Sequence, residues 1–177
     1  MALATNSNGK LNVIDKCKIT IGDYEVKLKI LPEITDSKRA TYTDTTIIGR
    51  SFPIKTYSHS DNRVISMRLH FLAVNSQGGD IEDMISDLWA IESAVYPREG
   101  SPYKPPPVCK IECGRMLGSE PLCAILESYN ASFPTNVVWD DRYLVPYYFT
   151  LDTTWHVVYA SDGTSMPYQN KILGDGS

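Results

Sequence analysis

The stretch that decides the fold is Val145-Pro-Tyr-Tyr-Phe-Thr-Leu-Asp-Thr-Thr-Trp-His-Val-Val-Tyr159. Seven of the eight residues on one parity of this stretch are apolar, and Thr153 is the polar one among them. Because successive side chains of a strand point to opposite faces, the pattern predicts a long strand with one buried face. A continuous strand of this length would span about 50 Å, so we expect a bend or bulge near residues 152–154.

Alternation of apolar and polar residues predicts five further strands. They are expected at residues 16–21, 24–31, 63–74, 108–113 and 122–133. Gly22-Asp23 between the first two favours a hairpin, and Pro32 ends the second. In the strand at 63–74, His70 belongs to the face opposite the apolar one, so we expect it at the surface or facing another subunit.

The sequence also predicts one main helix. Asp80 is a favourable N-cap residue, and Tyr96-Pro97 ends the helical pattern. Between them apolar residues recur at helical spacing, with Trp89 at the flank of the stripe. The stripe consists of Ile81, Met84, Ile85, Leu88, Ile91 and Val95. We expect this side of the helix to pack against the sheet.

These elements predict an α+β, mainly β fold, either an antiparallel β-sandwich or a partly closed barrel with one main helix (about 80–96). The length of 177 residues favours one β-domain at residues 16–160. Residues 1–15 are small and polar and are expected to form a flexible or docking N-terminal segment. Residues 161–177 are expected to form an extended C-terminal tail.

A Thr- and Asp-rich segment at residues 35–62 does not fit the pattern of a compact domain. Its β-branched residues favour extended structure over helix. Two interpretations remain open. The segment is either an irregular edge strand or a stretch that becomes ordered against a neighbouring subunit.

Charge and cysteine content narrow the classes of protein. The chain has 17 Lys and Arg against 21 Asp and Glu, without a clustered basic stripe, so a dedicated phosphate-backbone binder is not expected. No apolar run approaches the roughly 18 residues that span a bilayer, and the start lacks a secretory signal pattern. The four cysteines are therefore expected to be buried, reduced thiols rather than zinc ligands. They are Cys17, Cys109, Cys113 and Cys123.

Sequence motifs of catalysis are missing. The chain has no Gly-rich phosphate loop, no Gly-x-Ser-x-Gly elbow and no His-Glu-x-x-His pair. Asp140 and Asp141 stand beside Arg142 in a turn-like stretch, which favours a structural role over paired catalytic carboxylates. We expect neither an enzyme nor a cofactor, and a subunit of a larger assembly fits long strands with polar extensions.

Several stretches, in order, resemble the baseplate hub adaptor proteins of contractile phage tails and related injection systems. They are Ala40-Thr-Tyr42, Gly49-Arg-Ser-Phe-Pro53, Tyr57-Ser-His-Ser-Asp-Asn-Arg63, Ser66-Met-Arg-Leu-His-Phe71, the helix from Met84 to Tyr96, Pro105-Pro-Pro-Val-Cys-Lys-Ile-Glu-Cys-Gly114, Leu122 to Phe133, and Val145-Pro-Tyr-Tyr-Phe-Thr-Leu151. The resemblance covers roughly residues 25–155. Many such adaptors continue into a LysM domain, for which this chain has no room, so peptidoglycan binding is not expected.

The resemblance implies a structural protein of the virion that is assembled in the host cytoplasm. The fold would be like that of the tail tube, and the copies would form a ring, expected to be a hexamer. The partners would be the tail tube, the central hub or spike and the wedge proteins, and the role would be that of an inner-ring adaptor or a tube initiator. Specific binding of nucleic acid and association with a membrane are not expected. The candidate interface residues are Arg50, Phe52, Tyr57, Arg63, Arg68 and Arg142.

The alternative is a monomeric β-sandwich that binds carbohydrate. Tyr147, Tyr148, Trp155 and Trp139 would then form an aromatic platform. However, Tyr147 and Trp155 share the parity of the expected core, so such a platform would compete with the core itself.

Overall fold

The chain folds into a mainly β structure with one helix in its described part. The computed structural model describes residues 17–49, 51–74, 79–97, 105–118 and 120–159. The segments expected at 1–15 and 161–177 lie outside these residues. The predicted fold class is confirmed, and between its two variants the structure shows antiparallel sheets that are not closed into a barrel.

The main sheet has seven strands in the order β2-β1-β7-β8-β9-β6-β3, and each neighbouring pair is antiparallel. Its strands are β1 (Cys17–Ile21), β2 (Tyr24–Lys27), β3 (Glu33–Ser37), β6 (Val64–Leu72), β7 (Cys109–Cys113), β8 (Leu122–Ser132) and β9 (Tyr148–Val157). The hairpin predicted around Gly22 is present as β1 and β2. β2 and β3 are the two edges of the sheet.

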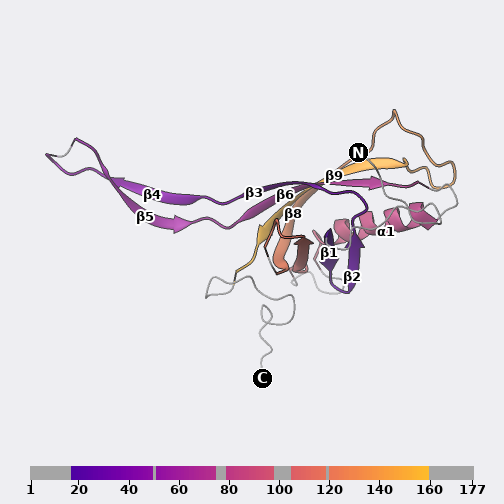
Figure 1. Cartoon of the computed structure of the whole chain (residues 1–177), viewed down its shortest axis with the longest axis horizontal. Coiled ribbons are helices and arrows are strands. Elements are labelled where there is room, and N and C mark those ends of the chain that lie inside the picture. The colour runs from indigo at the N-terminus through magenta and orange to yellow at the C-terminus, as the bar shows by residue number, and fades with distance from the viewer. Residues whose placement is uncertain (1–16, 50, 75–78, 98–104, 119, 160–177) are drawn as a thin grey trace, which may run out of the picture.

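A second sheet continues the chain away from the first. It consists of only β4 (Ala40–Thr45) and β5 (Ile54–Ser60), which pair with each other. Since β3 leads into β4 and β5 leads into β6, the four strands form one long hairpin whose base belongs to the main sheet. Its distal half projects far from the rest of the molecule (Figure 1). The interpretation of residues 35–62 as an edge strand holds for β3, which is an edge of the main sheet. Strands β4 and β5 continue beyond that edge.

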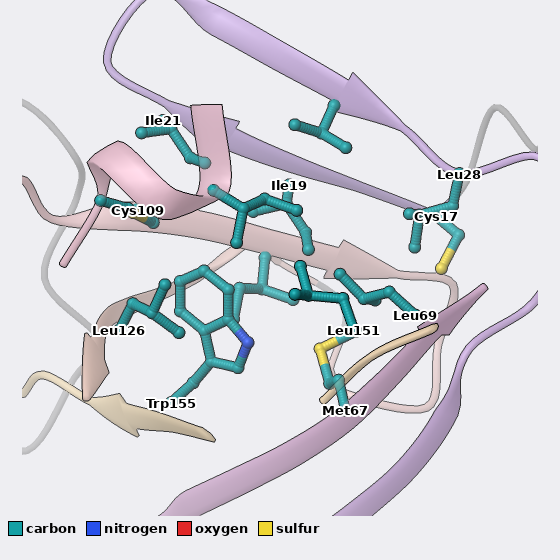
Figure 2. Packing of buried hydrophobic residues seen from close by; sticks show 14 of the residues in the cluster. Cys17, Ile19, Ile21, Leu28, Met67, Leu69, Cys109, Leu126, Leu151 and Trp155 are labelled. Carbon is teal, nitrogen blue, oxygen red and sulfur yellow. The ribbon is translucent and has the colours of Figure 1, made fainter. Parts of the chain in front are cut away.

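The core lies between the long strands β6, β8 and β9 and the short strands β1, β2 and β7. In Figure 2, Trp155, Leu151 and Met67 of the long strands point toward Ile19 and Cys17 of β1. The alternation predicted for β6 is confirmed, because all five residues of its expected inner face are buried. They are Ile65, Met67, Leu69, Phe71 and Ala73.

Strand β8 connects the two parts of the sheet. Its first residues pair with β7, and the strand from Ala124 onward pairs with β9. The register with β9 shifts between Leu126 and Ser128, which leaves Glu127 as an extra residue. A bulge of this kind bends and twists its strand, and here it helps to fold β7, β1 and β2 over the long strands.

The predicted irregularity at residues 152–154 was assigned to the wrong strand. β9 pairs with β6 without interruption from Tyr148 to His156, and the bulge lies on β8 opposite Thr154 and Trp155. The predicted strand was also too long. Val138 to Tyr147 form a separate small hairpin, in which the amide of Tyr147 donates to the carbonyl of Val138 at 3.0 Å.

Helix α1 (Gly79–Ser93) confirms the predicted helix, although its last residues to Tyr96 are turns rather than helix. Most of the apolar stripe is buried in the core. Asp87 faces β2, where the Tyr24 hydroxyl donates to its Oδ1 at 2.8 Å. Burial raises the pKa of the Asp87 carboxyl to about 6. Asp80 at the start of the helix lies 3.3 Å from the ammonium group of Lys29.

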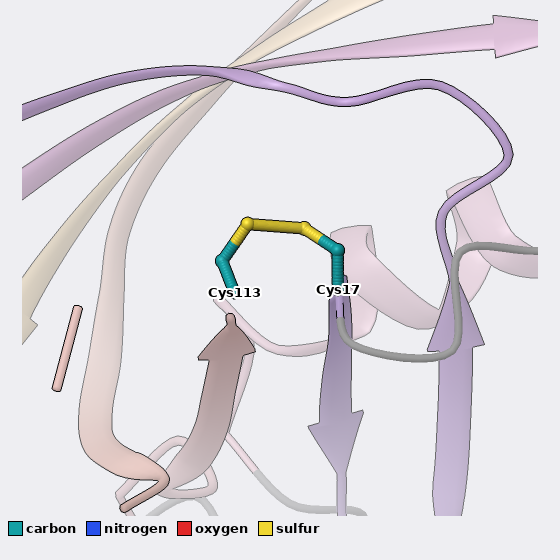
Figure 3. The surroundings of a disulfide bond; sticks show 2 residues. All are labelled: Cys17 and Cys113. Carbon is teal, nitrogen blue, oxygen red and sulfur yellow. A yellow bond between two sulfur atoms is a disulfide. The ribbon is translucent and has the colours of Figure 1, made fainter. Parts of the chain in front are cut away.

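The prediction of four reduced thiols was wrong for two of them. Cys17 and Cys113 form a disulfide between β1 and β7 (Figure 3). They stand directly opposite each other in the antiparallel register, with their Cα atoms 4.1 Å apart. The sequence argument inferred reduced thiols from the missing secretory signal pattern and did not consider a pairing across strands. Cys109 and Cys123 remain thiols and are buried, as predicted.

Counting thiols tests this disulfide. Unfolded protein without reductant should expose two reactive thiols to a thiol reagent, and four after reduction. Reduction should lower the free energy of unfolding by up to about 4–5 kcal/mol, because the disulfide closes a loop with a sequence separation of 96. Four reactive thiols in freshly purified, unreduced protein would contradict the assignment.

The single polar residue on the inner face of β9 has a definite role. Thr153 is buried, its hydroxyl donates to the Met67 carbonyl at 3.0 Å, and it accepts the indole N–H of Trp155 at 2.9 Å. This hydroxyl therefore satisfies the one polar atom of the largest core side chain.

Replacing this hydroxyl should be costly. Thr153→Val keeps the shape of the side chain but leaves the Trp155 indole N–H and the Met67 carbonyl without their partner. We expect a loss of about 1–3 kcal/mol in urea denaturation. The matched control is Thr153→Ser, which keeps the hydroxyl and should lose clearly less. Equal losses in the two variants would assign the effect to packing.

Candidate assembly interface

The most unusual surface of the molecule is the projecting arm, which we define as residues 38–61. It contains β4, β5 and the turn between them (Figure 1). None of its described residues is buried, and all except the half-buried Thr41 are exposed. A two-stranded hairpin on its own is at best marginally stable in water. The arm therefore lacks the packing that would normally hold such a structure.

Large apolar side chains cover this arm. Ile48 at its tip is fully exposed, and Phe52, four residues further along the chain, is 80% exposed. Nearer the body, the rings of Tyr42 and Tyr57 meet edge to face across the two strands at 5.8 Å. The remaining exposed members are Ile47 and Ile54. Grouped apolar side chains at the surface mark sites of interaction with other molecules.

The base of the arm is fastened to the body by an arginine. The guanidinium of Arg63 donates two hydrogen bonds to the carboxylate of Asp36 and also reaches the carbonyl of Leu117 at 3.3 Å. Hydrogen bonding from Arg63 lowers the pKa of the Asp36 carboxyl. This arrangement ties β3 and β6 to the turn that precedes β8, and so fixes the direction in which the arm leaves the sheet.

A second arginine crosses the outer face of the sheet. Arg68 of β6 donates to Asp152 of β9 at 2.7 Å and lies 3.8 Å from Glu33 of β3. These three residues are register partners on neighbouring strands. The ladder links the edge strand β3 to the centre of the sheet.

The structure places the six candidate interface residues in different surroundings. Phe52 and Tyr57 belong to the arm and are exposed. Arg63 and Arg68 are engaged within the chain, as described above. The guanidinium of Arg142 stacks over the ring of its neighbour Tyr143 at 5.0 Å, far from the arm. Arg50 lies outside the described residues.

A second apolar surface lies between α1 and the hairpin at residues 138–147. This apolar groove has a volume of about 490 Å³. It is lined by Glu82, Ile85, Ser86, Leu88, Trp89, Phe133, Trp139, Tyr143, Leu144, Val145, Pro146 and Phe149. Trp89 on the helix is 65% exposed and Leu144 on the hairpin is 76% exposed.

Local hydrogen bonds shape the wall of the groove. Asp140 accepts the backbone N–H groups of Arg142 and Tyr143 at 3.0 and 2.7 Å, which confirms the structural role predicted for this turn. The Tyr143 hydroxyl then donates to the Glu82 carboxylate of α1 at 2.5 Å. The hairpin is thereby held against the helix, and the exposed apolar side chains of the groove are Trp89, Phe133 and Leu144.

Two histidines of the main sheet each lie beside one polar side chain. Nδ1 of His70 lies 2.9 Å from the Tyr148 hydroxyl, and Nε2 of His156 lies 2.7 Å from Glu127. Within the described ranges, no group of three or more His, Cys, Asp or Glu side chains could hold a metal ion. Trp155 is fully buried, so the four-residue aromatic platform of the carbohydrate-binding alternative does not form at the surface.

Sequence reasoning missed several residues of these surfaces. Tyr42, Ile48 and Ile54 of the arm could have been found from the sequence. They are large apolar residues within a Thr-rich segment that has no alternating apolar pattern of its own. Leu144 and Trp139 of the groove gave no such signal, because their exposure depends on how the hairpin at 138–147 meets α1.

Comparison with known proteins gave no match, either to a protein-family model or to a curated sequence. Within the part of the chain that the structure describes, no helix has both the length and the apolar character needed to cross a membrane.

The arginine at the base of the arm can be tested separately from the arm itself. Arg63→Ala removes the hydrogen bonds to Asp36 and Leu117, and should lower the free energy of unfolding by about 1–2 kcal/mol. Amide hydrogen exchange in β3 should accelerate. Arg68→Ala is the matched control at a more exposed pair and should have a smaller effect. A larger effect of Arg68→Ala would show that the ladder, not Arg63, holds β3.

Proposed function

We propose that this chain is a structural subunit of the baseplate of a contractile phage tail, and that it uses the arm to join neighbouring subunits. In this role it is an inner-ring adaptor or a tube initiator in the virion, present as a homo-oligomeric ring of six copies. Its partners are the tail tube, the central hub or spike and the wedge proteins. It has no catalytic function and binds no specific nucleic acid.

The observation that carries this proposal is the exposed arm. An arm that buries nothing within its own chain, yet presents Ile48, Phe52 and two packed tyrosines, is suited to burial against another chain. Seven residues of β5 extend for about 23 Å, so the arm can reach well into a neighbour. Its free strand edges can also add to a neighbouring sheet through backbone hydrogen bonds.

The position of the sequence resemblance supports the same role. The first group of baseplate-like motifs, from Ala40 to Phe71, covers most of the arm and of strand β6. The hydrogen bonds of Arg63 and Arg68 also support the proposed role, because they hold the base of the arm in place on the main sheet. A rigid base lowers the entropy that assembly must overcome.

Removal of the arm tests the proposal. The amide of Asp61 donates to the carbonyl of Arg39 at 2.8 Å, so a two-residue Asn-Gly turn can replace residues 40–60 and close the hairpin there. The shortened protein should keep its circular dichroism spectrum. It should be monomeric by light scattering under conditions where the full chain forms rings, and should fail to enter tails in a complementation assay.

Two outcomes would contradict the proposal. One is incorporation of the shortened protein into tails at the normal level. The other is a full-length chain that stays monomeric and binds a defined glycan on an array, which would favour the carbohydrate-binding alternative.

A further inference from the structure

The arm and the apolar groove are two exposed apolar surfaces of one chain that cannot meet each other. In Figure 1 the arm projects from one end of the molecule and α1, which forms one wall of the groove, lies toward the other end. We propose that the arm of one copy seats its tip in the apolar groove of a second copy. This inference rests on the proposed assembly function and adds the receiving site.

The chemistry of the two surfaces matches. The groove is predominantly apolar and aromatic, and its exposed walls are Trp89 and Leu144. The tip presents Ile48 and Phe52, which have no intramolecular site to bury them. Aromatic side chains that line a concave site and receive an apolar anchor form the usual centre of a protein interface.

The charges of the two surfaces are also complementary. The sequence of the arm contains four basic and two acidic residues, namely Lys38, Arg39, Arg50 and Lys55 against Asp44 and Asp61. Helix α1 contains five acidic residues and no lysine or arginine. Asp80 is buried against Lys29 and Asp87 faces β2, whereas Glu82 lines the groove and Asp83 is exposed. The hairpin at residues 138–147 adds Asp140 and Asp141 against a single basic residue, Arg142. A positively charged arm is therefore attracted to the end of the molecule that carries the groove.

The contact is heterologous, because two different surfaces of the same chain meet. Contacts of this type close into rings when their rotation allows, and extend into filaments when it does not. Each chain would offer one arm and one groove, so that every copy in a ring has both surfaces occupied.

A mixing experiment distinguishes this contact from other uses of the arm. Ile48→Lys places a positive charge at the tip, and Trp89→Lys places a positive charge in the groove, so the altered tip and the altered groove repel each other. Each variant alone should be monomeric, with self-association weakened at least tenfold. An equimolar mixture should form 1:1 dimers by light scattering, because the intact arm of the second variant can enter the intact groove of the first.

Met116→Lys is the matched control, since Met116 is as exposed as Trp89 but lies outside the groove. It should assemble like the unmodified chain. Leu144→Lys provides a second groove variant if Trp89→Lys does not fold, as checked by circular dichroism.

The possible outcomes separate the two proposals. If groove variants assemble normally while Ile48→Lys does not, the arm binds elsewhere, and the groove assignment is overturned while the assembly function stands. Folded variants whose mixture stays monomeric also overturn it. If the unmodified chain does not self-associate and enters tails without its arm, both proposals fail.

Discussion

The pairing of β6 with β9 is the constraint on which the rest of the structure depends. Nine consecutive residue pairs, from Val64 with His156 to Leu72 with Tyr148, join these strands without a break. Their shared inner face buries the largest side chains of the core, including Trp155 and Phe149. β3 extends this pair on one side and β8 on the other. The arm inherits its direction from β6, because β5 runs directly into it.

Strong alternation of apolar and polar residues made the strands β6 and β9 predictable. The contacts that these strands make with other elements were harder to predict. β6, β7, β8 and α1 follow patterns that a single strand or helix reveals by itself. The bulge at Glu127 and the shortened β9 depend on which strands become neighbours. The same holds for the bond between Cys17 and Cys113, since only the order β1-β7 places them opposite each other. Patterns within one element cannot report such pairings.

The candidate interface was predictable to a similar degree. The Thr-rich segment at residues 35–62 did not fit the pattern of a compact domain, and the candidates Phe52 and Tyr57 within it are exposed in the structure. The candidate arginines were a weaker guide to the interface. A guanidinium can bond within its own chain or to another chain, and Arg63 bonds within its own chain. The groove is a tertiary feature in which residues of α1 and of a distant hairpin come together.

The disulfide has a topological consequence for the arm. Cys17 and Cys113 enclose a loop that contains the whole arm, β6 and α1. A protease that cuts the exposed tip of the arm would produce two fragments, one with each cysteine, and the disulfide would keep them covalently joined. The body could thus survive damage at its most accessible point as a single molecule. A long, exposed extension is therefore a smaller liability in this fold than its exposure alone would indicate.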